Sequence, residues 1–292
     1  MRINTSQALN SGDNKMSLKL VLLDRNAVDA IKRCVSGEYV ENCKRRQLES
    51  LDRSRNTISP ILSIIEGQSG RRESEEEIKL TLKKEAAAIR RFFKRARTDT
   101  HYFLSEEQID NFSKTFGNNI EYAWDSYTDF IKSVFPLLYQ PVSPTKPHDI
   151  ENQLFELAAK HYVQISHPVL VVSLATLYGH EGARKTLKAK KEYETQDKLD
   201  RAAYNVVCDI MSISRIGSIK AAMSKSKEIG DRVQLFTFDK GLLSLVSAVT
   251  INWGESLEDG GTKINCSYSK KLFPALNDEN YIRLTKRLGA II

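Results

Sequence analysis

Two short apolar runs, far apart in the chain, each end in an aspartate. The first is LKLVLLD at 18–24 and the second is VQLFTFD at 233–239. A continuous apolar run of this length is typical of a strand that is buried on both faces, and a helical pattern follows each aspartate at once. In open α/β sheets, ligands bind outside the carboxyl ends of the strands. The pattern therefore predicts that Asp24 and Asp239 lie along one functional edge of a mostly parallel sheet.

Helical periodicity covers much of the chain between these two runs. From Ser74 onward, apolar residues recur at helical spacing, with glutamates in the first turn and arginines near the end, which complements the helix dipole. A second helical pattern follows at 106–138. The segment 141–147 contains three prolines and is typical of a linker. We therefore expect 71–148 to be a helical insertion or subdomain.

The expected domain organisation has a polar tail at 1–16 and an α/β domain built from 17–70 and 149–292. Within that domain, 169–177 fits either a buried helix or a buried strand, because a short apolar run has no period that separates the two. Further elements are expected as follows: a helix at 204–211, a hairpin of 250–254 with 262–267, and a closing helix at 278–288.

Composition and charge are those of an ordinary globular protein, and they bear on its cellular compartment and its partners. The 292 residues are 41% hydrophobic, and 44 Lys and Arg against 37 Asp and Glu give a formal charge of +7, which is compatible with a polyanionic partner. The four cysteines form no CxxC pair, so we expect a reduced, cytoplasmic protein without a structural zinc. The longest apolar run, 168–177, is too short to span a bilayer, so no membrane association is expected. The sequence contains neither a Walker A loop nor a GxGxxG motif, which argues against a function driven by nucleotide hydrolysis.

Four acidic residues stand in apolar surroundings: Asp24, Glu66, Asp209 and Asp239. Burying a carboxylate is costly unless it is hydrogen-bonded, paired or bound to a cation. Clustered carboxylates suit Mg²⁺ or Mn²⁺, hard ions that prefer oxygen ligands and share them with a substrate phosphate. The sequence therefore indicates a metal site formed by these four residues.

The order of these motifs resembles the PIN-like nuclease superfamily. The resemblance is carried by four stretches: LKLVLLDRNAV, SPILSIIEG, YNVVCDIM and FTFDKGLL. It covers about half of the chain, and it implies a three-layer α/β/α domain around a mostly parallel sheet, here with a helical insertion. It also implies hydrolysis of phosphodiester bonds with Mg²⁺ or Mn²⁺, most often in RNA.

The resemblance assigns roles to particular residues. Asp24, Glu66, Asp209 and Asp239 match the acidic quartet, and Thr237 matches the small hydroxyl residue two positions before the last acid, where it would orient that acid or a metal-bound water. Because the long helical segment between the second and third acids departs from compact members, Glu85 is a rival to Glu66. By family analogy, such an enzyme would fit a toxin or a phage-defence effector.

Each of these features also has an interpretation without chemistry. Asp24 and Asp239 stand where aspartate is a preferred helix N-cap, and the basic residues Arg184, Lys185, Lys188 and Lys191 form either a phosphate-binding track or a solvated helix face. A non-catalytic binding module of the same fold and a structure-specific DNA nuclease are the alternatives to an endoribonuclease. The expected partner is nucleic acid, RNA before DNA. A homo-oligomer and an inhibitory or regulatory protein partner both stay open.

Overall fold

The computed structural model describes residues 19–66, 73–101, 105–107, 109–110, 124–142, 147–224, 232–256 and 262–289. The expected polar tail at 1–16 lies outside these residues. The same is true of 111–123, within the second expected helical pattern, and of 143–146, within the expected linker.

The sheet that carries the two predicted strands has four strands, all parallel, in the order β3-β2-β1-β4. β1 (Lys19–Leu23) lies between β2 (Asn56–Ser59) and β4 (Val233–Phe236), and β3 (Arg97–Thr98) adds a short edge. The predicted α/β class with a parallel sheet is confirmed. β1 and β4 pair directly, with Leu23 opposite Phe236, so their carboxyl ends meet at one edge of the sheet.

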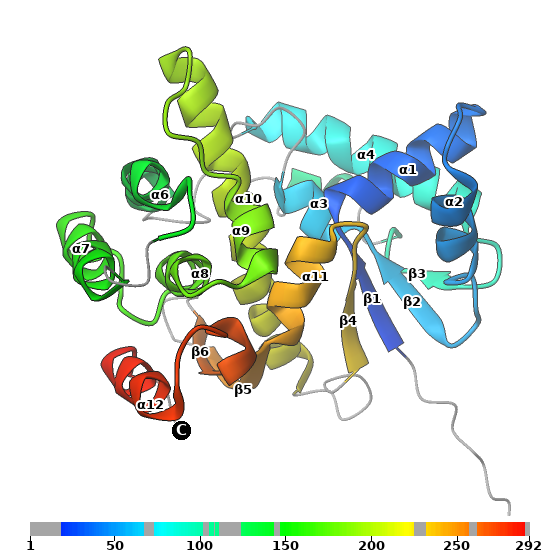
Figure 1. Ribbon diagram of the computed structural model, residues 1–292. Helices are drawn as coiled ribbons and strands as arrows, with labels where there is room; N and C mark the ends of the chain where they lie inside the picture. Colours follow the sequence, from blue (N-terminus) through cyan, green and yellow to red (C-terminus); the bar gives the residue numbers. More distant parts are fainter. Residues whose placement is uncertain are drawn as a thin grey trace, which may run out of the picture.

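Helices cover both faces of this sheet (Figure 1). α1 (Arg25–Ser36), α2 (Asn42–Glu49) and α4 (Glu75–Phe92) pack on the face that carries Val21 and Leu23. α3 (Ile61–Glu66), α10 (Gln196–Ser224) and α11 (Lys240–Ser247) pack on the face that carries Leu20 and Leu22. Successive residues of β1 therefore alternate between two buried layers, which explains why its sequence is apolar throughout rather than alternating.

A second and larger core lies beside the sheet and is mainly helical. It is formed by α6 (Trp124–Leu138), α7 (Pro147–Lys160), α8 (Pro168–Leu177), α9 (Glu181–Leu187), part of α10, and α12 (Asp278–Arg287), with the antiparallel hairpin of β5 (Val249–Ser256) and β6 (Thr262–Tyr268). The expected hairpin and closing helix are both present.

The apolar run at 169–177, which fitted a helix or a strand, is helix α8. His167 caps its first turn by accepting a hydrogen bond from the backbone N–H of Val169, and Pro168 occupies the first turn, where its missing N–H costs nothing. Every residue from Val169 to Leu177 is buried. A helix buried on all sides has no polar face, and this is why its sequence lacks the helical period.

The segment 71–148, expected as an insertion or subdomain, contributes to both cores. α4 begins with the capping box of Ser74 and Glu77 and packs its apolar stripe on α1, and the chain then adds β3 to the sheet. α6 packs on α7, α8 and α10 in the helical core. The described parts of this segment are therefore integrated into the fold rather than separate from it.

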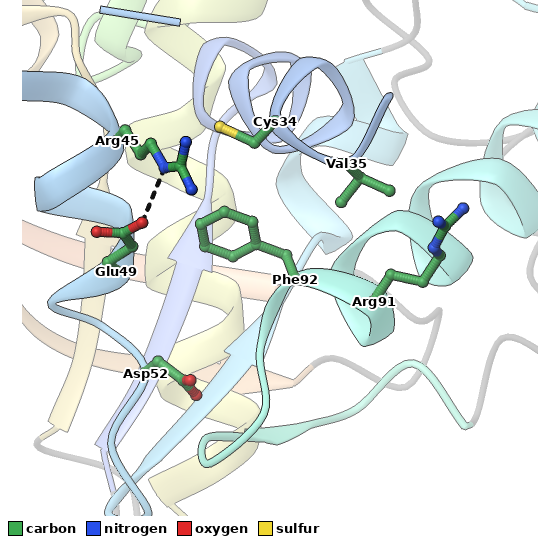
Figure 2. Close-up of a pocket in the computed structure, with 7 residues that line it drawn as sticks. All are labelled: Cys34, Val35, Arg45, Glu49, Asp52, Arg91 and Phe92. Atoms are coloured by element: carbon green, nitrogen blue, oxygen red, sulfur yellow. Dashed lines mark hydrogen bonds and ion pairs between the residues drawn. The ribbon is translucent and has the colours of Figure 1, made fainter. Parts of the chain in front are cut away.

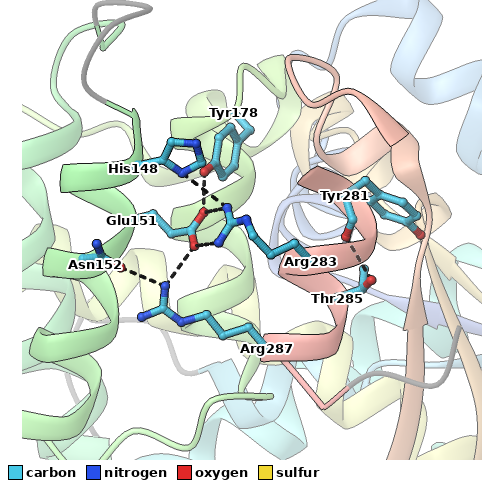
Figure 3. Close-up of polar contacts among 8 residues, drawn as sticks. All are labelled: His148, Glu151, Asn152, Tyr178, Tyr281, Arg283, Thr285 and Arg287. Carbon is cyan, nitrogen blue, oxygen red and sulfur yellow. Dashed lines mark hydrogen bonds and ion pairs between the residues drawn. The ribbon is translucent and has the colours of Figure 1, made fainter. Parts of the chain in front are cut away.

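A buried carboxylate joins the C-terminal helix to the helical core (Figure 3). Glu151 of α7 is 1% exposed and accepts hydrogen bonds from Tyr178, from both terminal nitrogens of Arg283 (2.7 and 2.8 Å) and from Arg287 (2.9 Å). Burial alone would raise the pKa of Glu151, but the donors Arg283 and Tyr178 outweigh it and hold that pKa below its usual range. The cluster is satisfied internally, so it fastens α12 to α7.

Candidate metal centre

Asp24 lies where β1 ends and α1 begins, and both of its carboxylate oxygens accept hydrogen bonds. One oxygen accepts from the backbone N–H of Ala27 at 2.8 Å, which makes Asp24 the N-cap of α1. The other accepts from the hydroxyl of Thr237 at 2.5 Å. The residue is 5% exposed, and burial raises its pKa despite these two bonds. The cap interpretation is therefore correct for Asp24, but it accounts for only one of the two oxygens.

Asp239 takes the equivalent position after β4. Its carboxylate accepts from the backbone N–H of Leu242 at 3.0 Å and caps α11. The hydroxyl of Thr237 accepts from the backbone N–H of Asp239 at 2.8 Å while it donates to Asp24. Thr237 thus connects the two loops, and the carboxylate that it orients is Asp24, whereas the resemblance would have it orient Asp239 or a metal-bound water.

The other two acids approach the same edge from helices. Glu66 ends α3, and its backbone carbonyl accepts from Tyr204 (3.5 Å) and the Cys208 thiol (3.8 Å), both on α10. Burial, with the charges of Asp209 and Asp24, raises the pKa of Glu66 to about 8. Three elements that are distant in sequence therefore bring acidic side chains to the end of β1.

Asp209 has a pKa raised to about 7, mainly by burial and further by the charges of Asp239 and Asp24. Its charge is in turn among the causes of the raised pKa of Glu66. The four predicted acids thus form one electrostatic cluster in which carboxylates oppose the ionisation of their neighbours.

Glu85, the rival to Glu66, has a different environment. Its side chain is 0% exposed, and Arg25 donates to it at 2.5 Å and also to the backbone carbonyl of Ser63. Lys32 lies 3.9 Å from the same carboxylate. Glu85 therefore belongs to an ion pair that joins α1 to α4, whereas Glu66 lies with the acids.

Lys188 is the cation that offsets the charge of Asp209. It follows α9 as the C-cap, in the left-handed region at φ 46°, which is uncommon for a lysine. α9 is held against α11 by close backbone contact, since a Cβ on Gly182 would lie 2.9 Å from the carbonyl oxygen of Gly241. This contact holds α9 against α11, and the exposed Lys188 at the end of α9 lowers the pKa of Asp209 from there. The sequence suggested Lys188 as a phosphate contact but gave no sign of its proximity to Asp209.

The other three basic residues proposed for nucleic acid differ from Lys188. The Arg184 guanidinium donates to the backbone carbonyls of Leu138 and Thr176, both at 3.2 Å, which gives it a structural role. Lys185 and Lys191 are exposed, as Lys188 is, but neither is among the charges that shift the pKa of Asp209, and Lys185 lies 3.9 Å from Glu181. Arg25 is a further basic residue at this edge: it directly follows Asp24, and its charge lowers the pKa of Glu66. Its position directly after the aspartate at the end of a predicted strand is the feature of the sequence that could have indicated this role.

The donor set fits a hard divalent cation, although its geometry is not that of a preformed centre. Within the described ranges, no group of three or more His, Cys, Asp and Glu side chains forms a set that holds a metal ion as it stands. The ligands are carboxylate oxygens, and burial together with the charges of neighbouring carboxylates raises the pKa values of Asp24, Glu66 and Asp209. A divalent cation is the counter-charge that such a group prefers.

No family model matches the chain, and comparison with curated proteins and with solved structures found no match either. None of the helices in the described part of the chain is both long and apolar enough to cross a lipid bilayer.

Proposed function

We propose that this protein is a PIN-like, metal-dependent nuclease that hydrolyses phosphodiester bonds, with RNA as the substrate class. The observation that carries the proposal is the meeting of four carboxylates at the carboxyl edge of a parallel sheet, where burial and the charges of neighbouring carboxylates raise the pKa values of Asp24, Glu66 and Asp209. A structural role explains a capping aspartate, but it gives no reason to bring Glu66 and Asp209 to the same edge.

The residues would divide the chemistry as follows. Asp24, Asp209 and Asp239 would hold Mg²⁺ or Mn²⁺, with Glu66 as a further ligand or as the base that accepts a proton from the attacking water. The bound ion would lower the pKa of that water and stabilise charge on the phosphate. Thr237 fixes the orientation of Asp24 through its 2.5 Å hydrogen bond.

Lys188 would contact the substrate phosphate. It lies beside Asp209, and a cation at this position can stabilise the additional negative charge that develops during hydrolysis. The affinity for the free ion is expected to be weak, because the carboxylates are not preformed as a metal centre and substrate phosphate completes the coordination of Mg²⁺. Roles as a toxin or phage-defence effector rest on the family resemblance and belong to this proposal.

Cleavage assays test the proposal directly. Labelled single-stranded RNA, single-stranded DNA and duplexes would be incubated with the protein in Mn²⁺, in Mg²⁺ and in EDTA, beside Asp209→Asn and Glu66→Gln. We expect metal-dependent RNA cleavage that falls at least 100-fold in both variants, a loss typical of a removed catalytic group. Cleavage of DNA alone would favour the structure-specific DNA nuclease. Cleavage that survives both substitutions would come from a contaminant or from another site.

A non-catalytic binding module is the second candidate. The observation that favours it is that Asp24 and Asp239 both cap helices while no preformed metal centre is present among the described residues. In that case the parent protein would bind nucleic acid or protein, and no substrate in the assay would be cleaved with either metal.

A further inference from the structure

Two basic segments that are distant in sequence meet on the side of the sheet formed by α2, the start of β2 and β3 (Figure 1). The carboxylate of Asp52, in the loop after α2, accepts the backbone N–H groups of Lys94, Arg95 and Ala96, at 3.1, 2.7 and 2.7 Å. This carboxylate fastens the α2–β2 loop to the α4–β3 connection. The negative charge of Asp52 is thereby stabilised by backbone N–H groups, while the neighbouring basic side chains are exposed to solvent.

We call the resulting surface the basic strip. It comprises nine residues: Lys44, Arg45, Arg46, Arg53, Arg55, Arg91, Lys94, Arg95 and Arg97. All except Lys44 are exposed. Three acids lie among them in the sequence, namely Glu41, Glu49 and Asp52, so the strip has a net charge of +6, nearly the +7 of the whole chain.

Within the described part of the chain, most of these cations form no ion pair. Lys44 pairs with Glu41 and Arg45 with Glu49, both at 2.9 Å. Among the described residues, the other seven take part in no ion pair. Arg91 also complements the dipole at the end of α4, but this explanation does not extend to the loop arginines. A dense group of unpaired arginines raises the local potential and favours a polyanionic partner.

A pocket of about 300 Å³ lies within the strip, between α1, α2 and α4. Figure 2 shows the Phe92 ring facing the ion pair of Arg45 and Glu49, with Arg91 on the opposite side. An aromatic ring flanked by arginines provides both a stacking surface and phosphate contacts. The pocket therefore offers room for one unit of a nucleic-acid strand.

The strip reaches the candidate metal centre. The ammonium of Lys44 lies 5.8 Å from the centroid of the Phe238 ring, and Phe238 stands between Thr237 and Asp239 in the loop after β4. Polyanion bound along α2 would therefore run toward the four carboxylates.

We propose that the basic strip binds the phosphate backbone of a nucleic-acid strand and leads that strand to the acidic edge of the sheet. The choice of nucleic acid over an acidic protein rests on the proposed function and on the predominance of arginine, which forms two parallel hydrogen bonds to a phosphate. The strip is separate from Lys188, which approaches the acids from α9.

Binding in the absence of cleavage tests the proposal. Fluorescence anisotropy of a labelled 20-nucleotide RNA would be measured in EDTA from 50 to 200 mM salt, for the parent and for the triple variant Arg53→Ala/Arg55→Ala/Arg95→Ala. We expect the triple variant to bind at least 10-fold more weakly at 100 mM salt. We also expect its plot of log K against log salt to be shallower by about 2, the slope of three phosphate contacts to a single strand.

A control of equal charge separates the strip from a general loss of positive charge. The variant Lys160→Ala/Lys271→Ala/Lys286→Ala removes three exposed cations from the helical part of the molecule and should bind within twofold of the parent. The triple replacement of the same arginines by lysine keeps the charge and should recover most of the salt dependence. Circular dichroism melting confirms that each variant is folded.

Several results would overturn the proposal: unchanged binding in the alanine triple, an equal loss in the control, or binding of polyglutamate in place of RNA, which would assign the strip to an acidic protein. The proposed function fails independently. RNA binding through the strip without cleavage contradicts the nuclease but supports the strip, whereas metal-dependent cleavage with an unchanged KM in the triple variant supports the nuclease and contradicts the strip.

Discussion

Replacing Asp209 by asparagine should stabilise the metal-free protein, which is unusual for the removal of a part-buried charge. The pKa of Asp209 is raised from 3.8 to about 7 in the folded state by burial and by the neighbouring Asp239 and Asp24. A carboxyl with a raised folded-state pKa contributes its full stability below pH 3.8 and loses it as the pH rises through about 7. At pH 8 the ionised side chain therefore opposes folding, and asparagine of similar shape removes this penalty.

The size of the effect follows from the shift. A difference of about three pH units corresponds to about 4 kcal/mol as an upper bound, at about 1.4 kcal/mol per unit. Asp209 is only partly buried, so screening by solvent reduces this free energy. We therefore expect a gain of about 1–3 kcal/mol at pH 8. For a chain of this size, this is an increase in Tm of roughly 2–6 °C.

The assay is thermal unfolding in EDTA at pH 5, 6, 7 and 8, with Asp197→Asn in the first turn of the same helix as the matched control. The gain for Asp209→Asn should be largest at pH 8 and shrink toward pH 5, while the control shows no such trend. A loss of stability at pH 8, or a gain that is equal at every pH, would refute the raised pKa of Asp209. Either result would instead favour Asp209 as a hydrogen-bonded residue on a half-exposed helix, without a role in a metal site.

Three further substitutions test separate parts of the structure. Glu85→Gln leaves the Arg25 guanidinium without its buried counter-charge and should destabilise the fold by about 3 kcal/mol in urea unfolding. Thr237→Val removes the hydroxyl that donates to Asp24, so metal-dependent cleavage should fall at least 10-fold with a stability loss of about 1–3 kcal/mol. Burial lowers the pKa of His167 to about 4, so its contribution to stability is complete above pH 6.5 and is lost as the pH falls toward 4. The variant His167→Asn keeps the cap on α8 and should therefore reduce the fall in Tm between pH 7 and 4.5.

Controls make these outcomes specific. Glu76→Gln, which removes an 83% exposed partner of Lys79, should change stability by less than about 0.5 kcal/mol. Thr237→Ser should restore cleavage, and failure of that rescue would mean that the methyl group rather than the hydroxyl is needed. An unchanged pH dependence in His167→Asn would show that this imidazole is not the group that titrates.

The sequence predicted the elements whose local pattern is strong. The buried strands ending at Asp24 and Asp239 were predicted because an apolar run followed by a helix start is a local signal. The helix from Ser74 was predicted for the same reason, from its apolar spacing and the glutamates of its first turn. The wholly buried α8 remained ambiguous because burial on all sides removes the period that distinguishes helix from strand.

Contacts between distant segments could not be predicted in this way. The ion pair of Arg25 with Glu85, the place of Lys188 beside Asp209, and the joining of the two basic segments through Asp52 all depend on tertiary packing. The family resemblance grouped the four acids, but only the structure shows that their charges interact. The same resemblance assigned Thr237 without revealing that its hydroxyl bonds Asp24.

Calorimetric titration with Mn²⁺, with and without a nucleoside monophosphate, tests whether the carboxylates at the end of β1 bind a metal ion. It would be carried out on the purified parent protein and on Asp24→Asn and Asp239→Asn. Asparagine is as good an N-cap as aspartate, so both variants should fold while losing a ligand. We expect weak binding in the parent, tighter binding with the phosphate present, and loss of both in each variant. Binding that is unchanged in the two folded variants, or absent from the parent even with the phosphate, would contradict a metal site at this edge of the sheet.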